Sequence, residues 1–598
     1  MKIAVVLPLF SEHRMRDYLG INLIVNFLEK NGHHVDCIDQ NEMLVQYLLS
    51  DQALLSPLFS ARMAHAKSAD SPYLKYFELY LDQIHQQGTV SGLKENLLYD
   101  YFFKNAVLPN LNLDRYPDQS VSEVHGRLPE EMPLLNDFLA FMAEDLKQKS
   151  YDAVLLSIPH IDQLMPGLLF GKRLKDTGCT AKIVFGGSSI TLLEEDVLSD
   201  YRNSGFFDYY VKYSGEEKLK GLLDHLASGK TIDQEALKEK VYVDIDTQTV
   251  AFSPEFSHTS VPVLYSRGCY WGKCTYCTYI YLDSGRFTRK NPEVLLSELE
   301  GFSGKPVRIS LITEALTPKD ARKIAEGILE RKIKITWGSF LRVDTGFDAP
   351  LFELLKRSGC IFTAVGVESA NDRVLQFFNK GYKARDVVTF FEAARKADYR
   401  FFQTNFMYGA PMANLADELD NIAFISEFRK TMGNIAFFRL EITKKSALGR
   451  DLQKFDIHVD LNSSRKAIRV DNIPFSLQLD DKEINLVERA YGAAADYFIR
   501  RDLNQAVNTL LESPDNLLNI SGIVLFEYHN QCFLGSMRSP LIKEISGKMF
   551  INLKSSENLR VKDLAREEIM TLFELKILNT DQIFWDQLEE NASNRGKP

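Results

Sequence analysis

The chain has 598 residues, of which 45% are apolar, 11% aromatic and 25% charged, and its 71 basic and 81 acidic side chains give a formal net charge of −10. This apolar content excludes a chain that is disordered throughout, because disorder requires low hydrophobicity and high charge density. The acidic balance provides no general attraction to nucleic acid or to anionic membranes. No apolar run reaches the roughly 18–20 residues of a membrane helix. We expect a cytoplasmic protein of roughly three or four domains, with neither nucleic acid nor a membrane as a partner.

The first forty residues predict a strand, a helix and a second strand. Residues 3–9 form a continuous apolar run, which is typical of a strand covered on both faces, so we expect a buried strand here and not a signal peptide. Apolar residues recur at helical spacing over 19–28, and 34–38 gives the next strand. This order predicts a parallel α/β sheet of the doubly wound type. About 110 residues then intervene, and we expect a helical insertion over 41–150, because a structureless loop of that length is implausible in a compact domain.

The alternation of strands and helices resumes at Tyr151, with strands expected over 153–159, 181–187 and 207–217, so the doubly wound domain is assigned to 1–240. Ligands in such sheets bind beyond the carboxyl ends of the strands. Glycine at that edge permits close backbone approach to a ligand, and an ordinary tight turn is the alternative interpretation. The first strand–helix turn lacks a GxGxxG pattern, which disfavours a dinucleotide site. The residues expected on this edge are Ser157, Pro159, His160, Gly186, Gly187, Ser188 and Gly215.

Strands and helices alternate again over 255–450, in roughly six repeats, which predicts a partial or complete parallel β/α barrel with its functional groups at the carboxyl ends of the strands. The remaining residues, 451–598, carry apolar residues mainly at helical spacing and predict a mainly helical C-terminal region.

The seven cysteines are an odd number spread over a long chain, which fits reduced thiols and not a disulfide framework. Cys269, Cys274 and Cys277 are spaced C-x4-C-x2-C directly after the first expected barrel strand. Three thiolates can each hold one iron of a [4Fe–4S] cluster and leave the fourth iron open. A structural zinc site is an alternative that needs a fourth ligand from elsewhere, and three incidental cysteines are another.

This cysteine segment, at the top of the first barrel strand, resembles the radical S-adenosylmethionine (SAM) superfamily, whose more common spacing has one residue fewer between the first two ligands. The stretches 366–382, 406–411 and 337–344 are similar to further motifs of that superfamily. The resemblance implies a [4Fe–4S] cluster on the three cysteines. For each carboxylate in these stretches, a structural ion pair is the alternative role. The SAM contacts that the resemblance implies are Tyr276, Glu314, Arg342, Glu368, Ser369 and Asn405.

A doubly wound domain ahead of such a barrel resembles the cobalamin-binding domain of the cobalamin-dependent radical SAM enzymes. Residues 208–217, DYYVKYSGEE, are similar to that family's D-x-x-x-x-GEGE turn. Tyr213 and Ser214 stand where the turn usually has a glycine after an acidic or small residue. The D-x-H-x-x-G signature of mutase-type domains is missing, so the resemblance implies a cobalamin without a protein histidine on its lower face. The cobalamin contacts that it implies are Ser157, His160, Gly186, Gly187, Ser188 and Gly215.

The resemblance implies an enzyme that methylates an unactivated carbon of a peptide or natural product. The reaction would proceed through a 5′-deoxyadenosyl radical and methylcobalamin, and an electron donor would be a partner of the enzyme. A cyclase or rearrangement enzyme that uses cobalamin without net methyl transfer is the alternative within the family. A non-catalytic cobalamin- or metal-binding sensor is the alternative of another class. The motifs cover about 1–40 and 150–450, and they assign neither the insertion nor the C-terminal region.

Overall fold

A computed structural model of the chain describes residues 1–9, 15, 18–50, 125–127, 130, 132–230, 232–241, 243–250, 260–282, 286–459, 472–512, 514–515, 518, 523–528, 530–536, 539–555, 559–575 and 577–578. The chain divides into two compact units, Met1–Gln40 with Leu113–Ala495, and Asn41–Asn112 with Asp496–Pro598. Most of the expected insertion, 51–124, lies outside the described residues. Within them, no helix is both long and apolar enough to cross a membrane.

The first unit begins with a five-stranded parallel sheet, here called sheet A, in the order β2-β1-β3-β4-β5. This strand order is typical of doubly wound sheets, as the sequence predicted. The order reverses between β1 and β3, since β2 lies on one side of β1 and the later strands lie on the other. The last strand is shorter than the expected 207–217, and Tyr213, three residues after its end, takes a left-handed backbone conformation with φ of 61°. The strands are β1 (Lys2–Leu7), β2 (His34–Asp39), β3 (Ala153–Ser157), β4 (Lys182–Gly186) and β5 (Tyr209–Tyr210).

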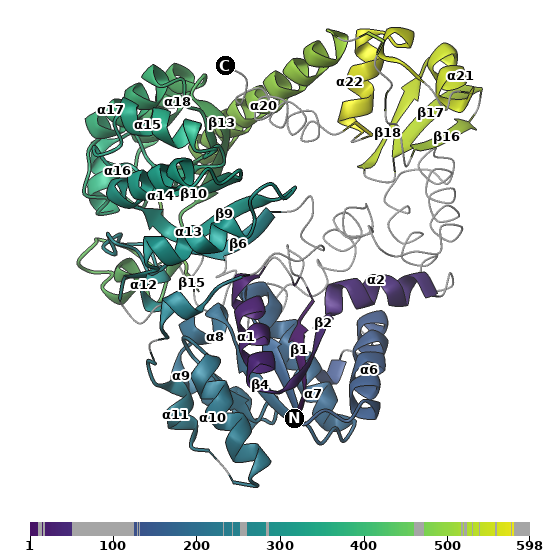
Figure 1. The fold of residues 1–598 in the computed structure, drawn as a ribbon, viewed down its shortest axis with the longest axis vertical. Helices are drawn as coiled ribbons and strands as arrows, with labels where there is room; N and C mark the ends of the chain where they lie inside the picture. Colours follow the sequence, from purple (N-terminus) through teal and green to yellow (C-terminus); the bar gives the residue numbers. More distant parts are fainter. Residues whose placement is uncertain are drawn as a thin grey trace. The chain divides into compact units, whose positions relative to one another are not determined.

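Helices cover both faces of sheet A, and its central strands β1, β3 and β4 accordingly bury mainly apolar residues. One face packs on α1 (Leu19–Lys30) and α10 (Glu216–Ala227), which bury Ile3 and Val5. On the other face, α7 (Leu164–Asp176) approaches closely at Gly171, where a Cβ atom would lie 2.3 Å from the Phe206 carbonyl oxygen. Figure 1 shows both layers. The remaining helices are α6 (Pro133–Gln148), α8 (Ser188–Leu192), α9 (Glu195–Asn203) and α11 (Gln234–Lys238).

The same unit contains a six-stranded parallel sheet, here called sheet B, in the order β13-β12-β11-β10-β9-β6. Consecutive strands lie side by side and a helix follows each of the central ones, which is the predicted β/α arrangement. The strands are β6 (Ser260–Leu264), β9 (Arg308–Leu316), β10 (Thr336–Arg342), β11 (Ala364–Glu368), β12 (Phe401–Tyr408) and β13 (Met432–Arg439).

Five helices of sheet B begin at residues whose side chains cap them. Asn291, Thr317, Asp348, Asn371 and Asn414 each accept a hydrogen bond from a backbone N–H in the first turn of the helix that follows. These caps fix where each β/α loop ends, and hence the edge at which the strand ends meet. The helices are α13 (Pro292–Glu300), α14 (Pro318–Glu330), α15 (Ala349–Arg357), α16 (Asp372–Phe377), α17 (Ala384–Lys396) and α18 (Leu415–Phe428).

The described part of the C-terminal region is mainly helical, as predicted, but it also holds a three-stranded antiparallel sheet that the sequence analysis missed. The long helix α20 (Asp481–Leu511) begins in the first unit and ends in the second. The second unit has its own core, in which Val507, Leu534 and Ile569 are fully buried. Its other elements are α2 (Gln40–Ser50), β16 (Ile523–Tyr528), β17 (Gln531–Ser536), β18 (Ser539–Ile545), α21 (Gly547–Ser555) and α22 (Arg566–Glu574).

Candidate functional site

The three clustered cysteines lie in one loop at the carboxyl edge of sheet B. The loop follows β6 and the short strand β7 (Ser266–Arg267), and it ends at α12 (Tyr279–Leu282). It turns at Gly268, whose φ is 73° and where a Cβ atom would lie 2.2 Å from the Arg286 carbonyl oxygen, so only glycine fits there. The thiols of Cys269, Cys274 and Cys277 are all half-buried.

The cysteine loop is fastened to the end of α16. Thr275 donates from its backbone N–H to the Phe378 carbonyl at 3.0 Å and from its hydroxyl to the Phe377 carbonyl at 2.8 Å. The Asn379 side-chain amide donates to the Lys273 carbonyl at 2.9 Å. The loop residues Lys273 and Thr275 are therefore held by the end of α16 and the two residues after it.

The longer spacing between the first two cysteines accommodates Trp271. Its indole N–H donates to the Asn379 carbonyl at 2.9 Å, and the Arg342 guanidinium lies 4.3 Å from its ring centroid. The indole also covers Gly381, where a Cβ atom would lie 2.1 Å from the ring and φ is 70°. The extra residue thus gives the loop an aromatic side chain that packs on the segment after α16.

The thiols of the loop influence one another. Burial raises the pKa of Cys277 to about 12, with further contributions from Cys274, Glu314 and Cys269. Burial also raises the pKa of Cys274, against the nearby positive charge of Lys380. All seven cysteines of the chain are free thiols. Among the described residues, no group of three or more His, Cys, Asp and Glu side chains is arranged to hold a single metal ion.

Glu368 lies at the carboxyl end of β11 and faces the cysteine loop. Its Oε1 accepts a hydrogen bond from the Tyr276 hydroxyl at 3.0 Å and pairs with the Lys380 Nζ at 3.3 Å. Lys380 is only 4% exposed. The backbone of Glu368 has a φ of 64°, a strained conformation for a residue with a side chain, which is typical of functional strand ends. The predicted residues Tyr276 and Glu368 are thus brought together, and Lys380 joins them.

Two more of the residues predicted to contact SAM lie on this edge. Asn405 is directly opposite Gly366 in the β11–β12 ladder, beside Glu368. Glu314, near the end of β9, contributes to raising the pKa of both Cys277 and Tyr279, although burial is the main cause in each case. The strand ends therefore gather a carboxylate and an amide around the cysteine loop.

The other two predicted residues are engaged with protein groups. The Arg342 guanidinium donates from Nη1 to the Val343 carbonyl at 3.2 Å and from Nη2 to the Lys380 carbonyl. The Ser369 hydroxyl is fully buried, donates to the Asn421 side chain at 3.1 Å and accepts from the Asn371 backbone N–H. Arg342 still presents a buried Nε that has no hydrogen-bond partner within the described structure.

A cavity of about 240 Å³ opens at the carboxyl edge of sheet A. Its inner part is apolar and lies between β1, β3 and β4 and the helices α1 and α10. Five of the six residues predicted to contact cobalamin line it, namely Ser157, Gly186, Gly187, Ser188 and Gly215. His160 does not line it; this residue is exposed, and its ring packs edge-on against Tyr18 at 5.9 Å.

Backbone conformation keeps the mouth of this cavity open. Gly187 has a φ of 103°, and a Cβ atom there would lie 2.7 Å from the Ile158 carbonyl oxygen. The Ser188 hydroxyl donates to the Pro159 carbonyl at 2.5 Å. Glycine at 187 is therefore needed by the turn itself, so the tight-turn interpretation and the ligand interpretation both apply to this position.

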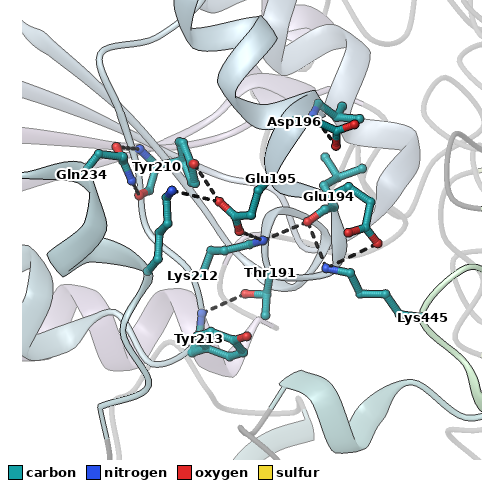
Figure 2. Close-up of polar contacts among 12 residues, drawn as sticks. Thr191, Glu194, Glu195, Asp196, Tyr210, Lys212, Tyr213, Gln234 and Lys445 are labelled. Atoms are coloured by element: carbon teal, nitrogen blue, oxygen red, sulfur yellow. Dashed lines mark hydrogen bonds and ion pairs between the residues drawn. The ribbon is translucent and has the colours of Figure 1, made fainter.

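Figure 2 shows a polar network that includes Thr191 and Tyr213. The Tyr213 backbone N–H donates to the Thr191 hydroxyl at 2.9 Å, and both residues line the cavity. The ammonium groups of Lys212 and Lys445 both donate to the Leu193 carbonyl, at 2.8 and 3.0 Å. Lys445 belongs to the segment after sheet B, so this carbonyl ties the edge of sheet A to that segment.

Arg267 connects the cavity with the cysteine loop. It lies two residues before Cys269, lines the cavity, and donates to the Ser214 hydroxyl at 2.6 Å and to Glu216 Oε1 at 3.2 Å. Neither Arg267 nor Glu216 was predicted as a site residue, although Glu216 stands inside the turn 208–217 and Arg267 lies two residues before the first clustered cysteine. Their contact with each other becomes visible only in the folded structure, where Arg267 donates to Glu216.

Residues 263–425 match the family model described as the radical SAM superfamily. The chain is 23% identical over 239 residues to an uncharacterised methyltransferase of Pyrococcus horikoshii, covering 36% of this chain and 51% of the relative. It is 22% identical over 266 residues to the bacteriochlorophyllide d C-8(2)-methyltransferase of Chlorobaculum tepidum, covering 41% of this chain and 57% of the relative. The chain thus spans about half the length of these curated relatives.

Among solved structures, the fold is similar to that of the cobalamin-dependent S-adenosylmethionine radical enzyme OxsB with aqua-cobalamin bound. The TM-score is 0.52 at 13% identity, and the match covers 87% of this chain and 69% of that one. This likeness confirms the predicted fold, a doubly wound sheet followed by a parallel β/α sheet. The family match confirms the resemblance that the cysteine spacing and the strand-end motifs indicated.

Proposed function

Since residues 263–425 form a radical SAM domain, we propose that the chain is a cobalamin-dependent radical SAM methyltransferase acting on an unactivated carbon of a peptide or natural product. The observation that carries this proposal is the position of Arg267, which lines the cavity of sheet A and stands two residues from the first cysteine of the loop. One residue thus borders both candidate cofactor sites. The methyltransferase names of the two relatives support the reaction class.

The cysteine loop has the donors that an iron–sulfur cluster requires. Cys269, Cys274 and Cys277 lie together at one strand edge. Burial is the main cause that raises the pKa of Cys274 and of Cys277, and the charge of Cys269 adds to both shifts. Three thiolates hold three irons of a [4Fe–4S] cluster and leave one open for a ligand such as SAM. Glu314, Glu368 and Asn405 surround the same edge and are the proposed contacts to SAM.

The cavity of sheet A suits part of a cobalamin and not all of it. Its volume of about 240 Å³ lies below the roughly 300–1,000 Å³ of sites that enclose a whole drug-sized ligand. An apolar interior beneath a glycine-lined mouth would hold one ring system, such as the nucleotide base, with the corrin ring outside. Gly186 and Gly187 would allow that approach without a side chain between ligand and backbone.

When bound, the reduced cluster supplies the electron that cleaves SAM and methylcobalamin supplies the methyl group. The protein's own residues position and shield these groups. In this proposal Tyr276 and Lys380 hold the Glu368 carboxylate in place, and Trp271 covers the segment that carries Lys380. The partners are an electron donor and a peptide or small-molecule substrate, in a reducing cytoplasmic setting that keeps the cysteines as thiols.

The test is anaerobic reconstitution of the full chain with iron, sulfide and hydroxocobalamin, followed by addition of SAM and reductant. We expect about four irons per chain, bound cobalamin, and 5′-deoxyadenosine as a product. The Cys269/Cys274/Cys277→Ala variant should lose the iron and the SAM cleavage. The matched control is Cys37/Cys179/Cys532→Ala, which removes three thiols elsewhere and should retain both. Iron-free protein, or unchanged SAM cleavage in the loop variant, would overturn the proposal.

Product analysis separates the alternatives. Methyl transfer yields S-adenosylhomocysteine, whereas 5′-deoxyadenosine without it indicates a cyclase or rearrangement reaction. A sensor would bind cobalamin or metal and cleave no SAM under any reducing condition.

A further inference from the structure

The Glu216 side chain uses its two oxygen atoms differently. Glu216 is the first residue of α10, lines the cavity of sheet A and is 3% exposed. Its Oε1 accepts hydrogen bonds from the Gln248 side-chain amide at 2.5 Å and from Arg267 Nη2 at 3.2 Å. Its Oε2 is closed off from solvent and has no hydrogen-bond partner within the described residues.

The carboxylate is held firmly in this orientation. Arg267 is itself fixed, because it donates to the Ser214 hydroxyl at 2.6 Å and to the Gln248 side-chain oxygen at 2.9 Å. The N-terminus of α10 also favours a negative charge at its first residue. A buried acceptor without a donor is uncommon in native proteins, and its burial is unfavourable. A donor from outside the protein would satisfy Oε2 and complete the site.

We propose that Glu216 Oε2 accepts a hydrogen bond from a neutral N–H or O–H donor of the ligand in this cavity. This inference rests on the proposed function, in which the ligand is cobalamin. Cobalamin carries such donors in the amides around the corrin ring and in the ribose hydroxyls of the nucleotide tail. An anionic group is excluded at this position by the charge of Glu216, and Nη1 and Nη2 of Arg267 already donate to protein acceptors.

The test measures hydroxocobalamin binding to the full-length protein by absorbance titration, without any turnover. In Glu216→Gln, the amide oxygen can take the place of Oε1 and its NH2 group then replaces Oε2, so a donor faces a donor. Glu216→Asp keeps the charge but withdraws the carboxylate by one methylene. Both variants should bind about tenfold or more weakly, since a hydrogen bond to a charged group is lost. The matched control is Glu217→Gln, which alters the exposed neighbouring residue and should bind as the wild type does.

Cobinamide, which keeps the corrin amides and lacks the nucleotide tail, distinguishes the two donors. Equal weakening for cobalamin and cobinamide in Glu216→Gln identifies a corrin amide. Weakening for cobalamin alone identifies the ribose hydroxyl. Either result supports the inference.

Two outcomes overturn it and can be told apart. If wild-type protein binds hydroxocobalamin and both Glu216 variants bind within twofold of it, the role of Glu216 is wrong and the proposed function stands. If the wild type binds no cobalamin, the cobalamin part of the proposed function fails and this inference fails with it. Thermal unfolding of each variant shows that it is folded, and Glu216→Asp is the deciding variant if Glu216→Gln does not fold.

Discussion

Lys380 and Glu368 form a buried ion pair beside the cysteine loop, with Nζ and Oε1 3.3 Å apart and side chains that are 5% and 12% exposed. Neither charge can be hydrated fully, so each depends on the other and on the Tyr276 hydroxyl. Removing one partner of such a pair leaves an uncompensated charge in a medium of low polarity.

Lys380→Met is therefore expected to destabilise the protein by about 3–5 kcal/mol, the usual cost of breaking a buried pair from one side. The double variant Lys380→Met/Glu368→Gln should recover part of this loss, because no charge is then left unpaired. Thermal unfolding of the two variants checks that the double variant is more stable than Lys380→Met alone. Lys356→Met is the control, since its partner Asp398 is 97% exposed and the pair contributes little. Equal losses for Lys380→Met and Lys356→Met would contradict the assignment.

Glu418, on α18, is a second buried carboxyl, and it forms no ion pair with any of the described residues. It is 2% exposed, its Oε1 accepts the Gly409 backbone N–H at 2.9 Å, and burial raises its pKa from 4.5 to about 7. Because the folded-state pKa lies above the unfolded one, this group stabilises the fold fully below pH 4.5. That stabilisation is lost as the pH rises through about 7.

Glu418→Gln should thus be neutral near pH 5 and stabilising at pH 8. The two pKa values differ by an amount that corresponds to roughly 3 kcal/mol, so the melting temperature at pH 8 should rise by several degrees. The measurement is the difference in melting temperature between variant and wild type across this pH range. Glu427→Gln on the same helix, at an exposed carboxylate, should give a small difference at every pH. A difference for Glu418→Gln that does not change with pH would argue against burial as the cause.

At the scale of single residues, sequence motifs identified the groups that carry chemistry but not the groups that hold them. The spacing of Cys269, Cys274 and Cys277 needs no fold to be recognised. Arg267 and Glu216, by contrast, are 51 residues apart, and nothing local marks them as partners. Arg342 was predicted to reach toward a cofactor, yet most of its donors are taken by backbone carbonyls that only the folded loop brings near.

At the scale of elements, one close contact of the cysteine loop is that of Trp271 with Gly381. Gly381→Ala combines two costs, a positive φ of 70° and a Cβ atom 2.1 Å from the indole. Gly304 has a similar φ of 73° with no atom within 4 Å of an added Cβ, so Gly304→Ala carries the first cost alone.

We expect Gly304→Ala to lose about 1–2 kcal/mol of stability and Gly381→Ala to lose roughly a further 1–3 kcal/mol through overpacking. Gly381→Ala should also retain less iron after reconstitution, because the displaced indole moves the loop. Adding Trp271→Ala to Gly381→Ala removes the clash and should bring back part of the stability. Indistinguishable melting temperatures for the two glycine variants would show that the loop does not rest on this contact.

Most elements of both parallel sheets were predictable because buried apolar strands alternate along the chain with amphipathic helices. The antiparallel strands β16 and β17 were not, since short apolar runs such as 523–526 fit a buried helix segment as well as a strand. Asn530, directly before β17, gives only a weak turn signal in the sequence. The short length of β5 was also not predicted, because nothing in the local sequence marks its end at Tyr210.

At the scale of the first unit, the Leu193 carbonyl provides one of the polar contacts between sheet A and the segment after sheet B. Lys212 holds it from within sheet A and Lys445 from the segment after sheet B. Lys445→Met should leave sheet B intact and loosen the edge of sheet A around Leu193. Amide exchange near Leu193 should become roughly tenfold faster, since a hydrogen bond to a charged group contributes about 1.5–3 kcal/mol.

The control for this prediction is Lys444→Met, which changes the exposed neighbouring lysine and should leave exchange unaltered. Faster exchange spread evenly over both sheets would mean that Lys445 supports global stability and not this contact.

The cysteine loop is attached at both ends to different parts of the first unit. Before Cys269, Arg267 is bonded to Ser214 and Glu216 of the sheet A domain, and after Trp271 the loop is bonded to the end of α16 in sheet B. The loop therefore reaches its final shape only after both sheets have formed and met. Maturation of the protein would follow a fixed order, in which the three thiols can bind iron only late in folding. A nascent or truncated chain that lacks sheet A would present the thiols in an incompletely folded loop.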